Sequence, residues 1–217
     1  MKTFLSIGTG PGIGFATAQR FAREGFRVIL SARNLEKTHK LAGLLNAMGY
    51  VAQVRAVDAS NATNIAELIA DVESEHGPLD VLHYNAANIR QATLADQPSD
   101  TFSSDLAVNI GGALAAAKAA MPQMITRGNG TILLTGGGFG VAPHPDYLSL
   151  SLGKAGIRAL SMALFEPSKA RGVHVASVTV ATFVEPNSAE AVGVAEAFWT
   201  LHSQPKESWT AEVTYAG

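Results

Sequence analysis

A glycine-rich turn close to the N-terminus constrains the fold of this chain more than any other segment. It lies between a short apolar run, Thr3 to Ile7, and a stretch with helical spacing, Gly14 to Arg23. Glycines between a strand and a helix allow a tight turn and a close approach of the backbone to a pyrophosphate, and the helix N-terminus adds N–H donors. The turn therefore predicts a dinucleotide-binding site. The residues expected to contact the cofactor there are Gly8, Gly10, Gly12, Ile13 and Gly14.

The spacing of these glycines is G-x-x-x-G-x-G, which differs from the commonest dinucleotide fingerprint, G-x-G-x-x-G. No Gly-Lys-Ser/Thr ending follows the turn, which excludes a P-loop. A purely structural glycine turn is the alternative interpretation. The position directly after the first strand and before the first helix favours cofactor binding.

Apolar runs and helical stretches alternate along the whole chain. The expected strands are Thr3–Ile7, Val28–Leu30, Val51–Val57, Leu79–Tyr84, Thr131–Thr135, Val173–Val180 and a weak Glu212–Tyr215. The expected helices are Gly14–Arg23, Leu35–Met48, Asn64–His76, Phe102–Met121, Ser149–Lys169 and Ala189–His202. Strands that are apolar on both faces and alternate with helices predict a doubly wound parallel α/β sheet of the Rossmann type. No linker interrupts the pattern, so residues 1–217 are expected to form a single domain.

Composition excludes several classes of function. The formal charge of -2 and the pI near 6.3 argue against nucleic acid as a partner. The absence of cysteine excludes disulfides, thiolate metal sites and a cysteine nucleophile. The six histidines are scattered without partners at ligand spacing, so no metal site is expected. No Gly-x-Ser-x-Gly elbow of a hydrolase is present.

The N-terminal residues lack the long apolar core of a secretory signal. The most apolar segment with helical spacing, Ala113 to Met121, is short and carries Lys118. We therefore expect no membrane-spanning segment and a cytoplasmic location.

The end of the second strand bears on the choice of cofactor. Folds that prefer NAD usually place an acid there to hold the ribose 2′-hydroxyl, whereas an arginine accommodates a 2′-phosphate. Ala32 supplies no acid and Arg33 supplies a cation, which favours NADP and leaves NAD possible. The alternative is that Arg33 is only a solvated loop charge.

The motifs together resemble the short-chain dehydrogenase/reductase family, over nearly the whole chain. The turn at residues 8–14 resembles its phosphate-binding motif, and Asp58 lies where the family holds the adenine ring. The segment containing Asn85 and Ala86 resembles the family's Asn-Asn-Ala-Gly, and Asn109 matches an asparagine that anchors a proton-relay water. The resemblance implies an oxidoreductase that transfers hydride between NADP(H) and a small carbonyl or alcohol substrate.

The family's catalytic pattern is a serine after the fifth strand and a Tyr-x-x-x-Lys pair on the next helix. Lys154 matches the lysine, which in the family also binds the nicotinamide ribose. Leu150 falls at the tyrosine position and Gly137 at the serine position. Two hypotheses follow: an oxidoreductase with a degenerate active site, or a catalytically inactive module that senses a dinucleotide.

Three nearby groups are candidates to replace the missing tyrosine. Tyr147 follows Asp146, a possible N-cap, and in a helix it would lie about 10.5 Å along the axis from Lys154. We name Tyr147 as the candidate acid/base, beside Lys154 and Asn109. His144 carries an imidazole, the side-chain type most often used for proton transfer near neutral pH, but an isolated loop histidine is usually exposed to solvent. Ser149 and Ser151 are expected to form hydrogen bonds at the helix end.

Two further expectations come from the family resemblance. The family usually has a helical lid after the sixth strand, whereas here the next helix begins near Ala189, so the lid near residues 181–189 is expected to be truncated. The helices Phe102–Met121 and Ser149–Lys169 resemble those that the family pairs across a two-fold axis. A homodimer or homotetramer is therefore expected.

Overall fold

The computed structural model describes all of residues 1–217 and contains one seven-stranded sheet. The strands are β1 (Thr3–Ile7), β2 (Arg27–Ala32), β3 (Ala52–Ala56), β4 (Val81–Tyr84), β5 (Gly130–Thr135), β6 (Val173–Val180) and β7 (Glu212–Tyr215). The helices are α1 (Ile13–Arg23), α2 (Leu35–Ala47), α3 (Ala62–His76), α4 (Ser99–Leu106), α5 (Gly112–Arg127), α6 (Leu148–Lys169) and α7 (Ala189–Ser203). Short helical turns lie at η1 (Ala107–Gly111), η2 (Gly138–Gly140) and η3 (Lys206–Ser208).

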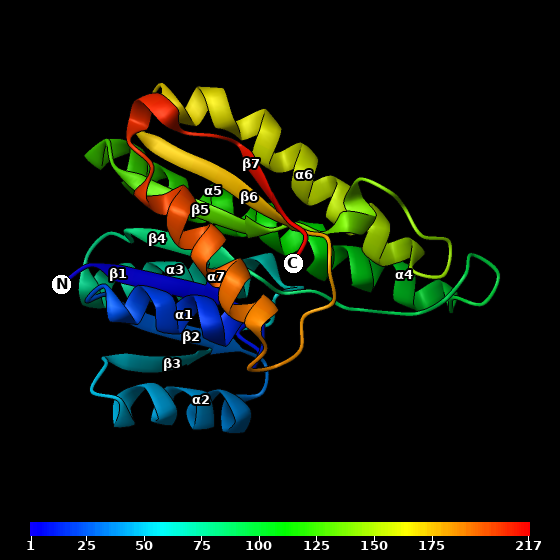
Figure 1. Cartoon of the computed structure of the whole chain (residues 1–217), viewed down its shortest axis with the longest axis horizontal. Coiled ribbons are helices and arrows are strands. Elements are labelled where there is room, and N and C mark those ends of the chain that lie inside the picture. The colour runs from blue at the N-terminus through cyan, green and yellow to red at the C-terminus, as the bar shows by residue number, and fades with distance from the viewer.

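The sheet confirms the expected doubly wound fold. Its strand order is β3-β2-β1-β4-β5-β6-β7, and every neighbouring pair is parallel. The chain winds outward from β1 in one direction and from β4 in the other, so the connections diverge between these two strands (Figure 1). Ligands of such sheets bind at the carboxyl ends of the strands beside this switch point.

Helices cover both faces of the sheet (Figure 1). Successive side chains of a strand point to opposite faces, so Leu5 and Ile7 of β1 pack with α3, α5 and α6, whereas Phe4 packs with α1, α2 and α7. All three side chains are fully buried. This two-sided burial is the reason why the strands are continuous apolar runs in the sequence.

The helical stretch expected at Phe102–Met121 is interrupted by a wider, π-helical turn at η1. The side chain of the buried Tyr84 lies against this turn, where its hydroxyl donates a hydrogen bond of 2.5 Å to the carbonyl of Val108. A Cβ at Gly112 would lie 2.2 Å from the same hydroxyl oxygen. A side chain inserted beside the helical hydrogen bonds is a common cause of such turns. The expectation of one regular helix was therefore wrong at this point.

One helix, α6, is long and apolar enough to cross a membrane by length and composition alone, with a mean hydropathy of 1.2 over its most apolar 18 residues. In this fold α6 packs against β6, and its Ile157 belongs to the core formed with α3 and α5. The helix is thus a core helix of the domain.

Candidate active site

A cavity of about 1220 Å³ lies at the switch point of the sheet. It is lined by the segments that follow β1, β2, β4, β5 and β6, together with the first turns of α6. Most of the residues proposed from the sequence line it. Those residues are Gly8, Gly10, Gly12, Ile13, Gly14, Arg33, Asn85, Ala86, Tyr147 and Lys154.

The glycine turn forms one wall of this cavity. Gly8 has φ of 87°, and a Cβ there would lie 2.4 Å from the backbone of Ala86. The side chain of Asn85 donates a hydrogen bond of 2.9 Å to the carbonyl of Gly8, which fixes the turn against the end of β4. A Cβ added at Gly10 would have no atom within 4 Å, and no side chain caps α1 at Gly12. The turn therefore presents open backbone and a free helix N-terminus to an anion.

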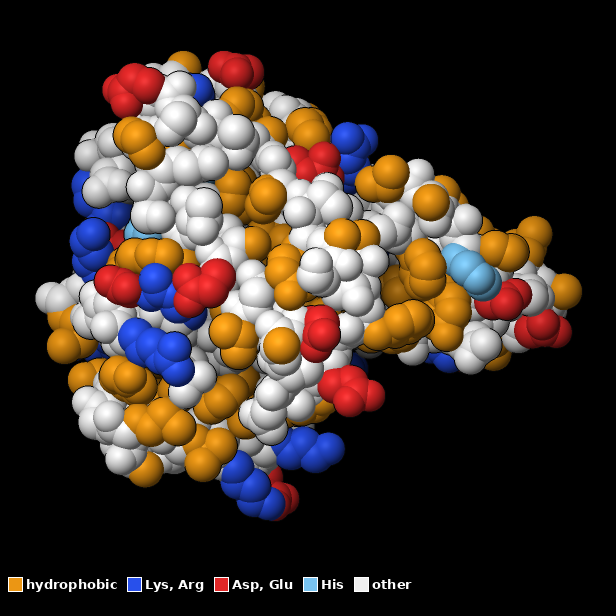
Figure 2. Space-filling model, viewed as in Figure 1, with side chains coloured by type: hydrophobic (Ala, Val, Ile, Leu, Met, Phe, Trp, Pro, Cys, Tyr) orange, Lys and Arg blue, Asp and Glu red, His pale blue; other side chains and the backbone are white.

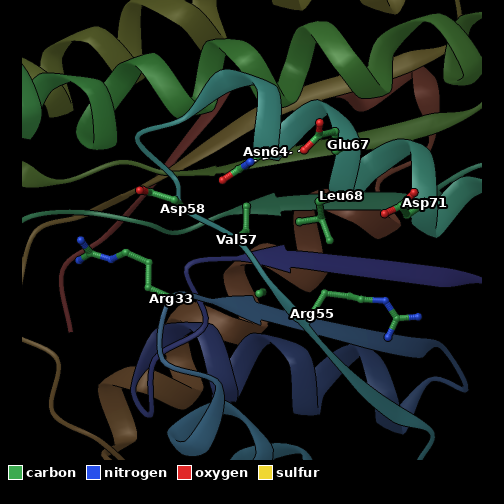
Figure 3. Close-up of a pocket in the computed structure, with 9 residues that line it drawn as sticks. Arg33, Arg55, Val57, Asp58, Asn64, Glu67, Leu68 and Asp71 are labelled. Carbon is green, nitrogen blue, oxygen red and sulfur yellow. Dashed lines mark hydrogen bonds between the residues drawn. The ribbon is translucent and has the colours of Figure 1, made fainter.

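Arg33 lies at the edge of the cavity, just after β2. It also lines a second, smaller hollow of about 410 Å³, which contains Asp58 as well (Figure 3). Figure 3 shows the side chains of Arg33 and Arg55 extending in opposite directions. Arg55 pairs with Glu75, whereas Arg33 is exposed and forms no ion pair. Arg33 is thus the guanidinium that is free to bind an anion here.

Asp58 lies two residues beyond the end of β3, because the strand ends at Ala56 and not at Val57 as expected. Its carboxylate accepts hydrogen bonds from the hydroxyl of Ser60 at 2.7 Å and from the Ser60 N–H at 2.9 Å. These bonds lower the pKa of Asp58 below its usual value, and the charge of Arg33 lowers it further. The carboxylate is therefore held ionised in a turn beside Arg33.

Lys154 lies at the other end of the cavity, beside the end of β5. Its Nζ donates a hydrogen bond of 2.7 Å to the carbonyl of Thr135. Burial lowers the pKa of the amine to about 8, because desolvation disfavours the charged form. A Cβ at Gly137 would lie 3.2 Å from Cγ of Lys154, so the lysine stem lies over this glycine. Leu150, one helical turn before the lysine, is 7 % exposed and also lines the cavity.

Thr135 joins several of these groups and was missed by the sequence analysis. Its hydroxyl donates to Oδ1 of Asn85 at 2.9 Å and lies 3.1 Å from Nε2 of His83. Because the single hydroxyl proton is used toward Asn85, Nε2 of His83 is the donor in the second bond. Burial holds the pKa of His83 at about 3, and the charge of Lys154 lowers it further. His83 is therefore a buried, hydrogen-bonded residue of the sheet.

Asn109 does not line the cavity. It is 1 % exposed, in η1, and both ends of its amide pair with the backbone of Asn88. Its Oδ1 accepts from the Asn88 N–H at 2.6 Å, and its Nδ2 donates to the Asn88 carbonyl at 3.1 Å. A Cβ at Gly153 would lie 2.3 Å from Cβ of Asn109, so the glycine lets α6 approach η1. Asn109 therefore holds residue 88, which does line the cavity, close to the helix of Lys154.

Tyr147 is placed differently from the sequence expectation. It is itself the N-cap of α6, with φ of -133°, so neither a helical Tyr147 nor an N-cap at Asp146 is correct. Its ring stacks on Phe139 at 5.3 Å and contacts the exposed His144 edge-on at 5.6 Å. This aromatic group forms a wall of the cavity. The adjoining 143–146 segment contains two prolines, which favour a turn over a helix.

The serines that flank Leu150 bind different partners. Ser151 accepts a hydrogen bond of 3.1 Å from the N–H of His144, which is the helix-end role expected. Ser149 instead donates to the buried carboxylate of Asp105 at 3.0 Å. Arg90 donates to the same carboxylate through Nε at 2.7 Å and Nη2 at 3.2 Å. Asn88 and Gln97 add one bond each at 3.2 Å.

This Asp105 cluster was also missed, because its members are scattered from residue 88 to residue 149. It joins the segment before α4 to the first turn of α6. The hydrogen bond from Arg90 contributes most to the lowered pKa of Asp105. The hydrogen bonds that Asp105 accepts from Ser149 and Asn88 lower the pKa further. The cluster therefore fixes one wall of the cavity through an ionised carboxylate.

The mouth of the cavity is apolar. Ile89, Val141 and Phe183 line it and are exposed to solvent, with Phe183 88 % exposed. Figure 2 shows hydrophobic side chains gathered where the projecting part of the molecule joins its body. An apolar entrance next to a polar floor is typical of a small-molecule site.

Comparison with known proteins agrees with this geometry. The family model for short chain dehydrogenase matches residues 2–192. An uncharacterized oxidoreductase of Staphylococcus aureus (strain USA300) is 28% identical over 223 residues, covering 98% of this chain and 96% of the relative.

Solved structures also superpose closely. A short-chain dehydrogenase from Rhodopseudomonas palustris has a TM-score of 0.90 and 25% identity, covering 99% of this chain and 97% of that one. A metagenomic short-chain oxidoreductase in complex with NADP has a TM-score of 0.89 and 26% identity, covering 99% and 96%.

Proposed function

The chain belongs to the short-chain dehydrogenase/reductase family of oxidoreductases, and from this premise we propose that it binds NADP(H) in the switch-point cavity and acts on a small carbonyl or alcohol. One observation carries the proposal: the glycine turn, Arg33 and Lys154 line a single cavity at the carboxyl ends of the strands. The metagenomic short-chain oxidoreductase that binds NADP supports the choice of cofactor.

The residues present fit a dinucleotide. The open space above Gly10 and the uncapped start of α1 suit a pyrophosphate, and the unpaired Arg33 suits a 2′-phosphate. Asp58, in the turn beside Arg33, would hold the adenine, and Asn85 and Ala86 contact the turn from the side of β4. Lys154 is the donor for the nicotinamide ribose. When bound, NADPH supplies a hydride to a carbonyl carbon.

The proton-transfer part of the site is the degenerate part. By the family pattern, Leu150 replaces the tyrosine and Gly137 the serine, so neither position carries a hydroxyl. Losing a positioned general acid costs roughly 10²- to 10⁴-fold in rate, and losing one donor to the reacting oxygen roughly 10²- to 10³-fold. Tyr147 is the remaining phenol in the cavity and is our candidate acid. Asn109 acts through Asn88 as a positioning residue.

The second candidate function is a dinucleotide sensor without turnover. The missing hydroxyls favour it, and so does the segment between β6 and α7, which is too short for a helical lid and leaves Phe183 in solvent. An uncovered cleft excludes water poorly, which disfavours hydride chemistry and suits a site that a partner covers.

A gain-of-function experiment separates the two candidates. The double variant Gly137→Ser with Leu150→Tyr restores both hydroxyls, and the serine Cβ fits once the flexible Lys154 side chain shifts by a few tenths of an ångström. NADPH binding is measured first by calorimetry, and NADPH oxidation is then followed with a panel of ketones and aldehydes. For an oxidoreductase the double variant turns over orders of magnitude faster than wild type or Gly137→Ser alone.

The other outcomes are equally informative. Wild-type turnover at an ordinary rate that Tyr147→Phe abolishes would identify Tyr147 as the acid. NADPH binding without turnover in either protein would support the sensor. An absence of NADPH and NADH binding would contradict both candidates.

A further inference from the structure

The cavity contains few groups that can react covalently. Among its lining residues only Arg33, Tyr147 and Lys154 titrate, and Lys154 is the one primary amine. Neither Asp nor Glu lines the cavity, and Lys154 forms no ion pair. Its amine therefore lies beside the cavity without the carboxylate that usually neutralises a buried lysine.

The side chain of Lys154 lines the cavity. One hydrogen bond, to the Thr135 carbonyl, orients Nζ. Gly137 contributes no side chain, and Leu150 presents methyl groups where a phenol would otherwise bind the reacting oxygen. A carbonyl compound that enters the cavity thus meets no hydroxyl at either position and can approach the amine itself.

We propose that Lys154 of the cofactor-free protein forms a Schiff base with small apolar aldehydes. The neutral amine attacks the aldehyde carbon with its lone pair, the π bond of the carbonyl opens, and one proton moves from nitrogen to oxygen, which gives a carbinolamine. The carbinolamine then loses its hydroxyl as water, with the proton from nitrogen, and leaves an imine bond between Nζ and the former carbonyl carbon. One water is released for each aldehyde bound, and no oxidant or reductant is consumed.

The charge state of the amine supports this reaction. A pKa of about 8 leaves roughly a tenth of Lys154 neutral at pH 7, whereas an ordinary lysine is neutral to roughly 0.03%. Desolvated lysines are the usual Schiff-base nucleophiles in proteins. The nearest titratable groups carry no negative charge that would stabilise the protonated amine. His83 of β4, behind Thr135, is neutral, and Tyr147 at the start of α6 stacks on Phe139 of η2.

The shape of the entrance sets the class of aldehyde. Ile89, Val141 and Phe183 at the mouth, and Phe139 and Leu150 farther along the lining, offer apolar contact. A short aliphatic aldehyde such as butanal gains from this contact, whereas a charged aldehyde such as glyoxylate does not. We therefore expect faster labelling by butanal than by glyoxylate.

The test is reductive trapping on the full chain without cofactor. The protein is incubated at pH 7 with butanal and sodium cyanoborohydride, and labelling of each amine is followed by peptide mass spectrometry. Mapping is needed because the α-amino group of Met1 also reacts near neutral pH. Exposed Lys118 of α5 is the internal control. We expect Lys154 to be labelled at least tenfold faster than Lys118.

Variants and cofactor complete the design. Lys154→Arg keeps the charge but cannot form an imine, so labelling is lost at residue 154 only, whereas Lys118→Arg leaves labelling of Lys154 unchanged. Equal labelling rates of Lys154 and Lys118 in the wild-type protein would overturn the proposal, whatever the folding of the variants. The inference does not depend on the proposed function. Unchanged labelling in saturating NADPH would contradict our placement of the cofactor but not the Schiff base.

Discussion

Substitutions at two glycines of the same turn should separate its structural role from its role toward a ligand. Gly8→Ala places a Cβ at 2.4 Å from the Cα and N of Ala86, where ordinary contacts begin at about 3.4 Å. The colliding atoms are backbone, so no side-chain rotation can relieve the contact. The φ of 87° adds strain for any residue with a Cβ. Gly10→Ala meets neither problem, because its Cβ has no atom within 4 Å and its φ is not positive.

The expected magnitudes differ accordingly. For Gly8→Ala, left-handed strain costs roughly 1–2 kcal/mol and overpacking roughly 1–3 kcal/mol, so we expect a loss of about 2–5 kcal/mol in the free energy of unfolding. For a chain of this length that lowers the melting temperature by roughly 4–20 °C. Gly10→Ala should stay within about 0.5 kcal/mol of wild type. Its methyl group fills the open space offered to the pyrophosphate, and NADPH affinity should fall by about tenfold or more.

The assays are thermal unfolding followed by circular dichroism and calorimetric titration with NADPH. Equal melting temperatures for Gly8→Ala and wild type would refute the packing argument. A stable Gly10→Ala protein that binds NADPH as well as wild type does would refute the placement of the pyrophosphate at this turn.

The remaining predictions concern the Asp105 cluster, the cofactor and self-association. Asp105→Asn should lower the free energy of unfolding by about 2 kcal/mol at pH 7. Because folding lowers the pKa of Asp105 below its ordinary 3.8, this difference should shrink as pH falls below that value, which urea denaturation at pH 7 and pH 3 would measure. Arg33→Ala should weaken NADPH binding and leave NADH binding unchanged by calorimetry; equal losses would contradict a 2′-phosphate contact. Leu114 of α5 and Leu152 of α6 are exposed apolar residues on the helices expected to pair, and light scattering should give a multiple of 22.6 kDa at micromolar concentration. A monomer mass would refute the pairing.

The fold was predictable because its signals are local. Buried parallel strands must be apolar on both faces, so each strand is visible as an apolar run, and β1, β6 and β7 end where the sequence predicts. The glycine turn was equally visible, since its backbone geometry depends on residues next to one another. The same reasoning failed at η1, because the π-helical turn depends on Tyr84, which lies 24 residues before Val108.

The candidate site divides along the same line. Lys154 and the glycines were each found from a short motif, whose residues lie close together in the sequence. Thr135 and Asp105 were not, because their partners come from other strands and loops and leave no spacing in the sequence. The prediction of a helical Tyr147 was wrong because Tyr147 lies at the N-cap of α6, where its ring stacks on Phe139. That contact is with a residue outside the helix.

The sequence by itself determined the parallel sheet, the position of the glycine turn and the absence of hydroxyls at Gly137 and Leu150. Only the tertiary structure decided the environment of Lys154. Its pKa depends on how much water the neighbouring elements exclude, and its orientation depends on the carbonyl of Thr135, 19 residues away. Desolvation and hydrogen bonding are properties of the space that the folded chain encloses, so residue type and spacing do not specify them.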